Sequence, residues 1–222
     1  MTLVVVLVVV AAVAWYLQGQ RRPGAGSSAA AEARRLRTPV IRLADLLGIE
    51  TAAGQRARRF AAGAVGEKAT AALLRTLARE GWIILHDLAL PASDANVDHL
   101  AIAPSGRIFL VESKQWSGDF LVHSRGTRLF HGEVDVDYRL DGLRYGARTV
   151  ARVLGCPVLP LVAMHLAPVK GDGVSVGAIR IVPAALVCAR LRGLARHPGH
   201  DLSQAAVAAL VAARLPSHGR TR

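Results

Sequence analysis

Apolar and polar positions follow two different periods along this chain, and the change of period separates predicted helices from predicted strands. Helical patterns, with apolar residues three or four positions apart, are expected over residues 61–79, 143–154, 184–196 and 202–214. Short apolar runs bounded by turn residues predict strands over residues 82–90, 97–103, 107–113, 119–123, 128–131, 157–165 and 178–182. A helix, then antiparallel strands, then further helices and strands is an order typical of the α/β class. We therefore expect a mixed sheet flanked by helices.

The chain begins with an apolar run without charges, residues 2–17, which reads TLVVVLVVVAAVAWYL. As a helix, 16–18 residues rise about 24–27 Å, at the short end of what spans a bilayer. Trp15 and Tyr16 close the run where aromatic rings favour lipid headgroups, and Arg21 and Arg22 follow it. We therefore expect residues 1–18 to form a single transmembrane helix in the cell membrane, with the remaining domain on the cytoplasmic side.

A cleaved signal peptide is the competing interpretation of this apolar run. It would carry basic residues before the apolar core and small residues before the cleavage point, and this chain has neither. A start codon assigned too early would remove the transmembrane expectation and leave the expectations for the domain unchanged.

The segment 19–54 is basic and contains a run of Gly, Ala and Ser directly after Pro23. Residues 18–60 hold nine Lys or Arg against three Asp or Glu. This composition predicts a flexible juxtamembrane linker. A helical piece around residues 40–47 either lies on the inner leaflet, helped by arginines, or belongs to a solvated tether.

Composition limits the class of protein and of partner. Of 222 residues, 52% are apolar and 20% are charged, which excludes a wholly disordered chain, a collagen-like repeat and a multi-pass membrane protein. We expect the core domain over residues 55–170, with residues 171–222 completing or flanking it. Two cysteines cannot build a disulfide framework or a cysteine-rich zinc site. The net charge of +12 permits a polyanionic partner without requiring one, since arginine outnumbers lysine 25 to 3, as in a general composition bias.

Candidate chemistry gathers on two of the predicted strands. Side chains alternate along a strand, so Glu112 and Lys114 share one face at the end of a run that is otherwise apolar. If residues 104–106 form a three-residue hairpin loop, Asp98 lies directly opposite Glu112, with Cβ atoms about 4.5–5.5 Å apart. Two facing carboxylates repel unless a cation lies between them. Mg²⁺ is a suitable cation, because it takes oxygen ligands and is often held by one or two carboxylates.

Two further charged groups belong to this candidate site. Glu67 lies in an early turn of the first predicted helix, off its apolar stripe, where it could reach a water on the metal. Lys114 would be a fixed cation that orients the attacking water or stabilises charge in the transition state. His99 follows Asp98 directly but points to the other face of the strand, and we interpret it as structural.

These residues form an ordered series of motifs that resembles a known family. The series is Gly63-x-x-Gly66-Glu67, Gly81-Trp82, Asn96-x-Asp98-His99, Pro104-Ser105-Gly106 and Val111-Glu112-Ser113-Lys114-Gln115-Trp116-Ser117-Gly118. It is similar to the nuclease-related domain (NERD), which is assigned to the PD-(D/E)xK, or restriction-endonuclease-like, superfamily. The likeness is dense over residues 61–120 and thinner to about residue 165.

The resemblance implies a restriction-endonuclease-like fold and a phosphodiesterase core that depends on Mg²⁺ or Mn²⁺. Asp98 and Glu112 would be metal ligands together with the Ser113 carbonyl, Lys114 would be catalytic, and Glu67 would assist.

One departure from the family concerns the helix that follows the core. Such domains often carry a Gln there that faces the site, and residues 143–154 contain none. Arg144 or Arg148 is expected to replace it as a contact to nucleic-acid phosphates.

The functional hypothesis is a membrane-anchored nuclease that hydrolyses phosphodiester bonds, with DNA ahead of RNA as the substrate. The alternative is a catalytically inactive module that holds nucleic acid or a protein at the membrane, because fold alone does not establish activity. A further alternative is an envelope or stress protein that acts through its linker.

Overall fold

A six-stranded mixed sheet forms the centre of the molecule, in the strand order β1-β2-β3-β7-β9-β8. The computed structural model describes residues 24–47, 49–196 and 200–217. Neighbouring strands pair antiparallel at β1/β2, β2/β3 and β8/β9, and parallel at β3/β7 and β7/β9. The sheet strands are β1 (Ile83–Ala89), β2 (Asn96–Ile102), β3 (Ile108–Trp116), β7 (Val158–Leu166), β8 (Val174–Val176) and β9 (Ile179–Pro183).

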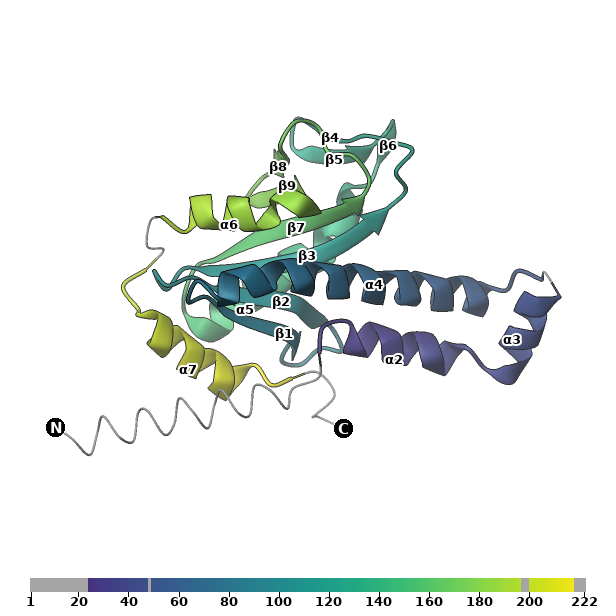
Figure 1. Cartoon of the computed structure of the whole chain (residues 1–222), viewed down its shortest axis with the longest axis horizontal. Helices are drawn as coiled ribbons and strands as arrows, with labels where there is room; N and C mark the ends of the chain where they lie inside the picture. Colours follow the sequence, from purple (N-terminus) through teal and green to yellow (C-terminus); the bar gives the residue numbers. More distant parts are fainter. Residues whose placement is uncertain (1–23, 48, 197–199, 218–222) are drawn as a thin grey trace.

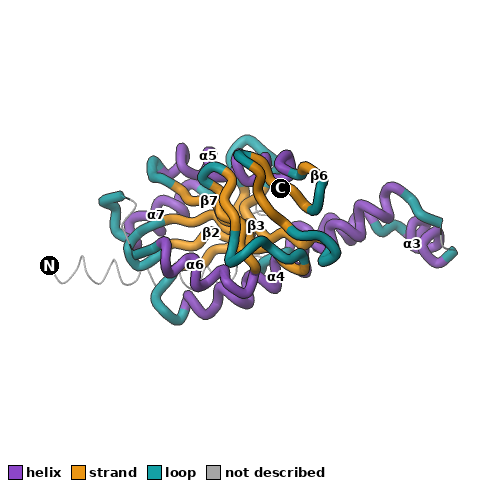
Figure 2. Tube along the Cα trace, turned by 90° about the horizontal axis from the view of Figure 1, so that it is seen from above, coloured by secondary structure: helices purple, strands orange, loops and turns teal. Residues whose placement is uncertain are grey.

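Helices cover both faces of this sheet, which gives three layers (Figures 1 and 2). Leu74 and Leu77 of one helix and Leu191 of another pack with Phe109 and Val111 of β3 in one buried cluster. The opposite face of β3 packs in a second cluster with the other two helices. The first pair of helices is α4 (Ala52–Ala78) and α6 (Val187–Leu194), and the second pair is α5 (Asp141–Leu154) and α7 (Gln204–Arg214).

The β2–β3 hairpin has the expected three-residue loop. His99 pairs with Val111 and Ile102 with Ile108, and the Ala103 N–H donates to the Arg107 carbonyl at 2.9 Å. Gly106 permits this turn, since its φ is +82° and a Cβ there would lie 2.4 Å from the Leu202 carbonyl oxygen. The predicted register is therefore confirmed, and with it the approach of Asp98 to β3.

The predicted α/β class is confirmed, with some differences in detail. Between β3 and α5 the chain forms a separate three-stranded sheet, of which the sequence pattern predicted two strands. It consists of β4 (Val122–Arg125), β5 (Arg128–His131) and β6 (Val134–Asp135), and a 3₁₀ turn η1 (Asp137–Leu140) leads from it into α5. A second 3₁₀ turn, η2 (Ala184–Leu186), precedes α6. The strand β9 pairs with β7, so part of the segment 171–222 completes the central sheet.

The expectation of a flexible linker over residues 19–54 is wrong for its described part, but the helical piece expected around residues 40–47 is confirmed by the helix Pro39–Leu46. The described part forms α2 (Ser27–Leu36) and α3 (Pro39–Leu46), and α4 begins at Ala52, before the expected domain boundary at residue 55. Figure 1 shows α2 lying along α4, with α3 at their far end. Gly26 permits the contact, because its φ is +74° and a Cβ there would lie 2.8 Å from the Ala64 carbonyl oxygen of α4. The glycine that indicated flexibility is thus required for close packing.

The predicted transmembrane run over residues 2–17 lies outside the described residues. Among the helices that are described, none combines the length and the apolar character needed to cross a membrane.

Candidate active site

The predicted acidic pair lies where β2 and β3 separate. Pairing of the two strands ends at His99 and Val111, and the Asp98 carboxylate continues the contact in place of the backbone. Its Oδ2 accepts a hydrogen bond from the Ser113 N–H at 2.9 Å. Asp98 is thereby fixed to β3 at Ser113, one residue beyond Glu112, which the predicted register places directly opposite Asp98.

Glu112 and Lys114 form an ion pair on one face of β3. Lys114 Nζ lies 2.5 Å from Glu112 Oε1, and about a fifth of each side chain remains exposed. The second oxygen, Glu112 Oε2, is buried and has no hydrogen-bond partner among the described residues. The ion pair therefore satisfies only one of the two carboxylate oxygens of Glu112.

The third carboxylate, Glu67, comes from α4, which crosses the sheet above β3. Gly66 brings the helix close, since a Cβ at this position would lie 3.6 Å from Gln115 Oε1 and 3.9 Å from the His165 ring. Glu67 is only 7% exposed, and its Oε2 has no hydrogen-bond partner among the described residues. Glu67 is close enough for its charge to act on Asp98 and to be affected by Glu112, and its assisting role stays a prediction.

Burial, with a smaller effect of mutual repulsion, raises the pKa values of two of these acids. Burial raises the pKa of Glu67 to about 7, assisted by the charges of Asp87 and Glu112 and opposed by a hydrogen bond from the Gly26 N–H. Burial also raises the pKa of Asp98 well above its ordinary value, and the charges of Glu67 and Glu112 add to this effect. The raised pKa values favour the protonated forms of Glu67 and Asp98, and a cation beside them would favour the charged forms.

Asp87, on β1, is a member of this acidic group that the sequence analysis missed. It is fully buried and has a positive φ of 52°, which is unusual for a residue other than glycine. Its Oδ1 accepts from Asn96 Nδ2 at 2.8 Å. Its Oδ2 accepts from the Ser27 hydroxyl and from the Ser28 N–H at the start of α2. An Asp inside an apolar strand was the available signal, and its α2 partners could not be read from the sequence.

A chain of buried hydrogen bonds supports β3 from the α4 side. His86 Nδ1 lies 2.8 Å from His99 Nδ1, and His99 Nε2 lies 3.1 Å from Ser113 Oγ. The Ser113 hydroxyl donates to Thr70 Oγ1 at 2.8 Å, and Thr70 Oγ1 lies 2.7 Å from His165 Nε2. One direction of donation from His86 to His165 satisfies every link when the three imidazoles are neutral.

Burial favours that neutral state. It lowers the pKa of His86 to about 4, and it lowers the pKa values of His99 and His165 as well. His99 is therefore structural, as expected, and its structural role is to hold Ser113.

Comparison with known protein families agrees with this geometry. Residues 62–165 match the family model of NERD, the nuclease-related domain. The match covers just under half of the chain, and the segment 62–165 is named the nuclease-related domain for this match. The match begins in α4, before Glu67, and ends in β7 at His165, so it contains Asp98, Glu112 and Lys114. The mixed sheet is consistent with the restriction-endonuclease-like superfamily. No curated protein and no solved structure matches the chain.

The acids of the nuclease-related domain have the chemistry to bind a hard divalent cation. Within residues 24–47, 49–196 and 200–217, no three His, Cys, Asp or Glu side chains come together as a ready-made metal cluster. A Mg²⁺ site needs only one or two carboxylates, completed by water and other oxygens. Glu112 Oε2 and Glu67 Oε2 are buried acceptors that no donor among the described residues reaches, which is a costly arrangement unless a cation or water compensates it. These two oxygens have the chemistry of cation ligands, and ligation by Asp98, Glu112 and the Ser113 carbonyl stays a prediction.

The two arginines expected to contact phosphates differ in their surroundings. Arg144 Nη2 bonds both carboxylate oxygens of Asp137, at 2.9 and 3.0 Å, and Nη1 bonds Asp141 at 2.9 Å. Arg144 thus joins the 3₁₀ turn to α5, and its role in the nuclease-related domain is structural rather than that of an open phosphate contact. Arg148 is exposed on α5, and its contact with phosphates stays a prediction.

Proposed function

We propose that this protein is a membrane-anchored nuclease that hydrolyses phosphodiester bonds in DNA with the help of Mg²⁺ or Mn²⁺. The observation that carries the proposal is that Asp98, Glu112 and Glu67 lie close enough for their charges to act on one another, with Lys114 paired to Glu112. Glu67 and Glu112 each keep a buried oxygen with no hydrogen-bond partner among the described residues. An ion pair with a purely structural role would need only one acid beside Lys114, whereas Glu112 has two further acids close to it, Asp98 and Glu67.

The acids and the lysine would have different roles in the reaction. Asp98, Glu112 and the Ser113 carbonyl would hold the ion, which when bound makes water more acidic and neutralises charge on a phosphate. Lys114 would leave Glu112 for the phosphate oxygens and stabilise the charge that develops there.

Glu67 would exchange a proton with the attacking water. Its pKa of about 7 suits this role, since a general acid or base acts best when its pKa lies near the working pH. Glu67 lies in α4, so a rigid helix holds the carboxylate in place.

Membrane attachment rests on residues 2–17, which are apolar and free of charge. The arginines that follow this run favour retention of the domain on the cytoplasmic side. DNA is the proposed substrate because it is a polyanion present on that side of the membrane, and a basic protein attracts it. Contacts to its phosphates would not distinguish one base sequence from another.

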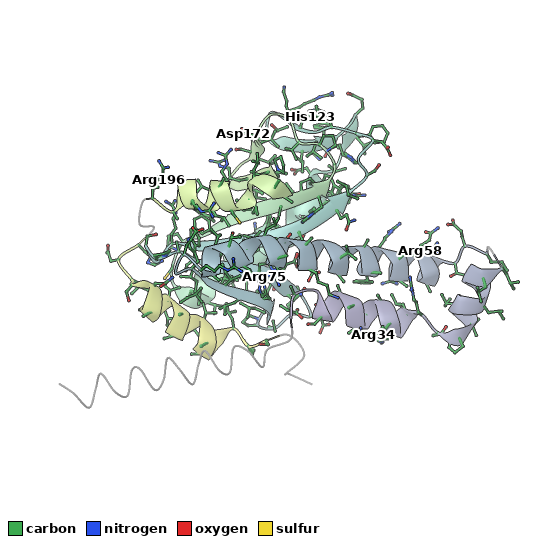
Figure 3. All side chains as sticks on the ribbon, in the orientation of Figure 1. Arg34, Arg58, Arg75, His123, Asp172 and Arg196 are labelled. Carbon is green, nitrogen blue, oxygen red and sulfur yellow. The ribbon has the colours of Figure 1, made fainter. Side chains whose placement is uncertain are left out.

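The test is a cleavage assay on the full chain in mild detergent. Linear, circular and single-stranded DNA and RNA would be incubated with Mg²⁺, with Mn²⁺ and with chelator. We expect metal-dependent cleavage of DNA that falls at least about 100-fold in Asp98→Asn and in Lys114→Ala, the scale of losing an electrostatic contact to the transition state. The matched control is Asp172→Asn, an exposed acid that is not part of the acidic group and pairs with Arg190; Figure 3 labels Asp172.

A binding module without catalysis is the second candidate, because the Lys114–Glu112 ion pair would also suit a scaffold. Binding of Mn²⁺, measured by electron paramagnetic resonance, separates the two. A folded wild type that neither cleaves nor binds Mn²⁺ would refute the nuclease and favour the module.

A further inference from the structure

The far end of the α2–α4 pair exposes a group of large aliphatic side chains that we call the tip patch. Its members belong to α3 and to the residues that follow it. Their exposed fractions are 75% for Val40, 58% for Leu43, 84% for Leu46, 66% for Leu47 and 55% for Ile49. Single exposed aliphatic residues are common, but five within ten positions form a patch that calls for a partner.

The tip patch projects away from the sheet. In Figure 1, α2 and α4 lie side by side and α3 closes the pair at the end remote from α7. Figure 2 shows α3 beyond the edge of the sheet layers. The patch is therefore presented to whatever lies beyond the tip, and the active site does not include it.

Basic residues surround the tip patch. Residues 34–59 hold seven arginines and two acids, Asp45 and Glu50. Arg35 pairs with Glu32 and Arg58 pairs with Glu50. The exposed arginines come from the adjoining ends of α2 and α4, and two of them, Arg34 and Arg58, are labelled in Figure 3: Arg34, Arg35, Arg37, Arg56, Arg58 and Arg59. An apolar centre within a basic rim matches the interface of an anionic lipid leaflet, where the acyl region takes the aliphatic groups and the headgroups take the arginines.

Other occupants fit the tip patch less well. A nucleic acid would pair with the arginines and leave the aliphatic side chains in water. A second copy would bury the aliphatic groups and place arginines against arginines. The apolar run 2–17, which is expected to enter the membrane, is joined to the described part of the chain by residues 18–23 alone, and six residues extend at most about 20 Å.

We propose that α3 docks into the surface of an anionic membrane as a second contact, separate from the N-terminal run. The α2–α4 pair then acts as a strut that holds the nuclease-related domain at a fixed height and orientation above the lipid. This inference goes beyond the proposed nuclease activity and does not depend on it.

The experiment places a polarity-sensitive nitrobenzoxadiazole dye on the patch of the full chain. Leu43→Cys would be labelled in a Cys188→Ser background, since Cys156 is buried and Cys188 is half-buried. The protein would be mixed with vesicles of phosphatidylcholine alone or with added phosphatidylglycerol, some carrying a spin-labelled lipid that quenches the dye. Flotation measures attachment by any route. Leu166→Cys is the control, because Leu166 is an exposed leucine at the end of β7, with an exposed fraction of 69%.

The proposal expects a blue shift and lipid quenching at position 43 in anionic vesicles, and neither at position 166. Adding Val40→Glu and Leu46→Glu should abolish the quenching while flotation persists through the N-terminal run. Flotation with a water-exposed dye at position 43 would overturn the docking of α3 and leave the N-terminal anchor intact. Absence of flotation, equal quenching in neutral vesicles, or self-quenching between copies without lipid quenching would also overturn it.

Discussion

Two buried threonines give opposite expectations for the same substitution, Thr→Val. Thr70 is fully buried on α4, where its hydroxyl accepts from Ser113 at 2.8 Å and lies 2.7 Å from His165 Nε2. Thr149 is 4% exposed on α5, and its hydroxyl has no hydrogen-bond partner among the described residues. Valine has nearly the same shape as threonine, so each substitution changes the hydrogen bonding more than the packing.

The magnitudes follow from these partners. Thr70→Val removes two hydrogen bonds, each worth about 1 kcal/mol, and Ser113 keeps its contact with His99 while His165 is partly open to water. We expect a loss of about 2 kcal/mol in the free energy of unfolding, or about 4–8 °C in Tm. Thr149→Val removes a buried hydroxyl without a partner and should stabilise the protein by about 1 kcal/mol.

The assay is urea denaturation of the full chain in mild detergent, followed by tryptophan fluorescence, with Tm as a second measure. Thr70→Ser serves as a rescue variant, because it keeps the hydroxyl and should recover most of the lost stability. A Thr70→Val variant as stable as the wild type, or a shift of equal sign and size in both valine variants, would refute the role assigned to the buried chain of hydrogen bonds.

The remaining predictions concern the acid on α4, the start of α2 and the two arginines of α5. Burial raises the pKa of Glu67 to about 7 from 4.5, so its contribution to stability is full below about pH 4.5 and is lost as the pH rises through 7. With chelator present, the free energy of unfolding of the wild type should fall by about 2 kcal/mol more than that of Glu67→Gln between about pH 4.5 and pH 7. Urea denaturation at each pH measures this difference. Gly26→Ala should lower the free energy of unfolding by about 1–3 kcal/mol, because Gly26 has a φ of +74° and a Cβ there would lie 2.8 Å from a backbone oxygen of α4. Gly63→Ala should raise it by about 0.5–1 kcal/mol in the same urea assay, because Gly63 lies inside α4 and a Cβ there would meet open space. Arg144→Ala should lower Tm with little change in DNA affinity per folded molecule, whereas Arg148→Ala should weaken binding measured by fluorescence anisotropy; the reverse pattern would contradict the structural role of Arg144.

Local patterns were enough to predict the part of the site that lies on one hairpin. The three-residue loop at residues 104–106 fixed the register, and alternation along the strand placed Glu112 and Lys114 on one face. These predictions sufficed because alternation and loop length are local properties. Helical spacing misjudged Glu67, since it left Glu67 off an apolar stripe that included Val65, whereas Val65 is 59% exposed and Glu67 lies on the buried face of α4.

Segments distant in sequence decided what the pattern could not. Ser27 and Asp87 are 60 positions apart, and their hydrogen bond exists only because α2 folds back along α4. Read alone, the small residues at 24–28 indicate flexibility, since no local signal shows that Gly26 must pass close to Ala64. The expected linker was wrong for this reason.

The sequence by itself determined which residue types face each other across the hairpin, because side-chain alternation and loop length are local properties of a strand pair. Tertiary structure decided how those residues behave. The raised pKa of Glu67, the buried chain from His86 to His165 and the commitment of Arg144 to Asp137 all depend on which groups lose water and which gain partners when separate elements pack together.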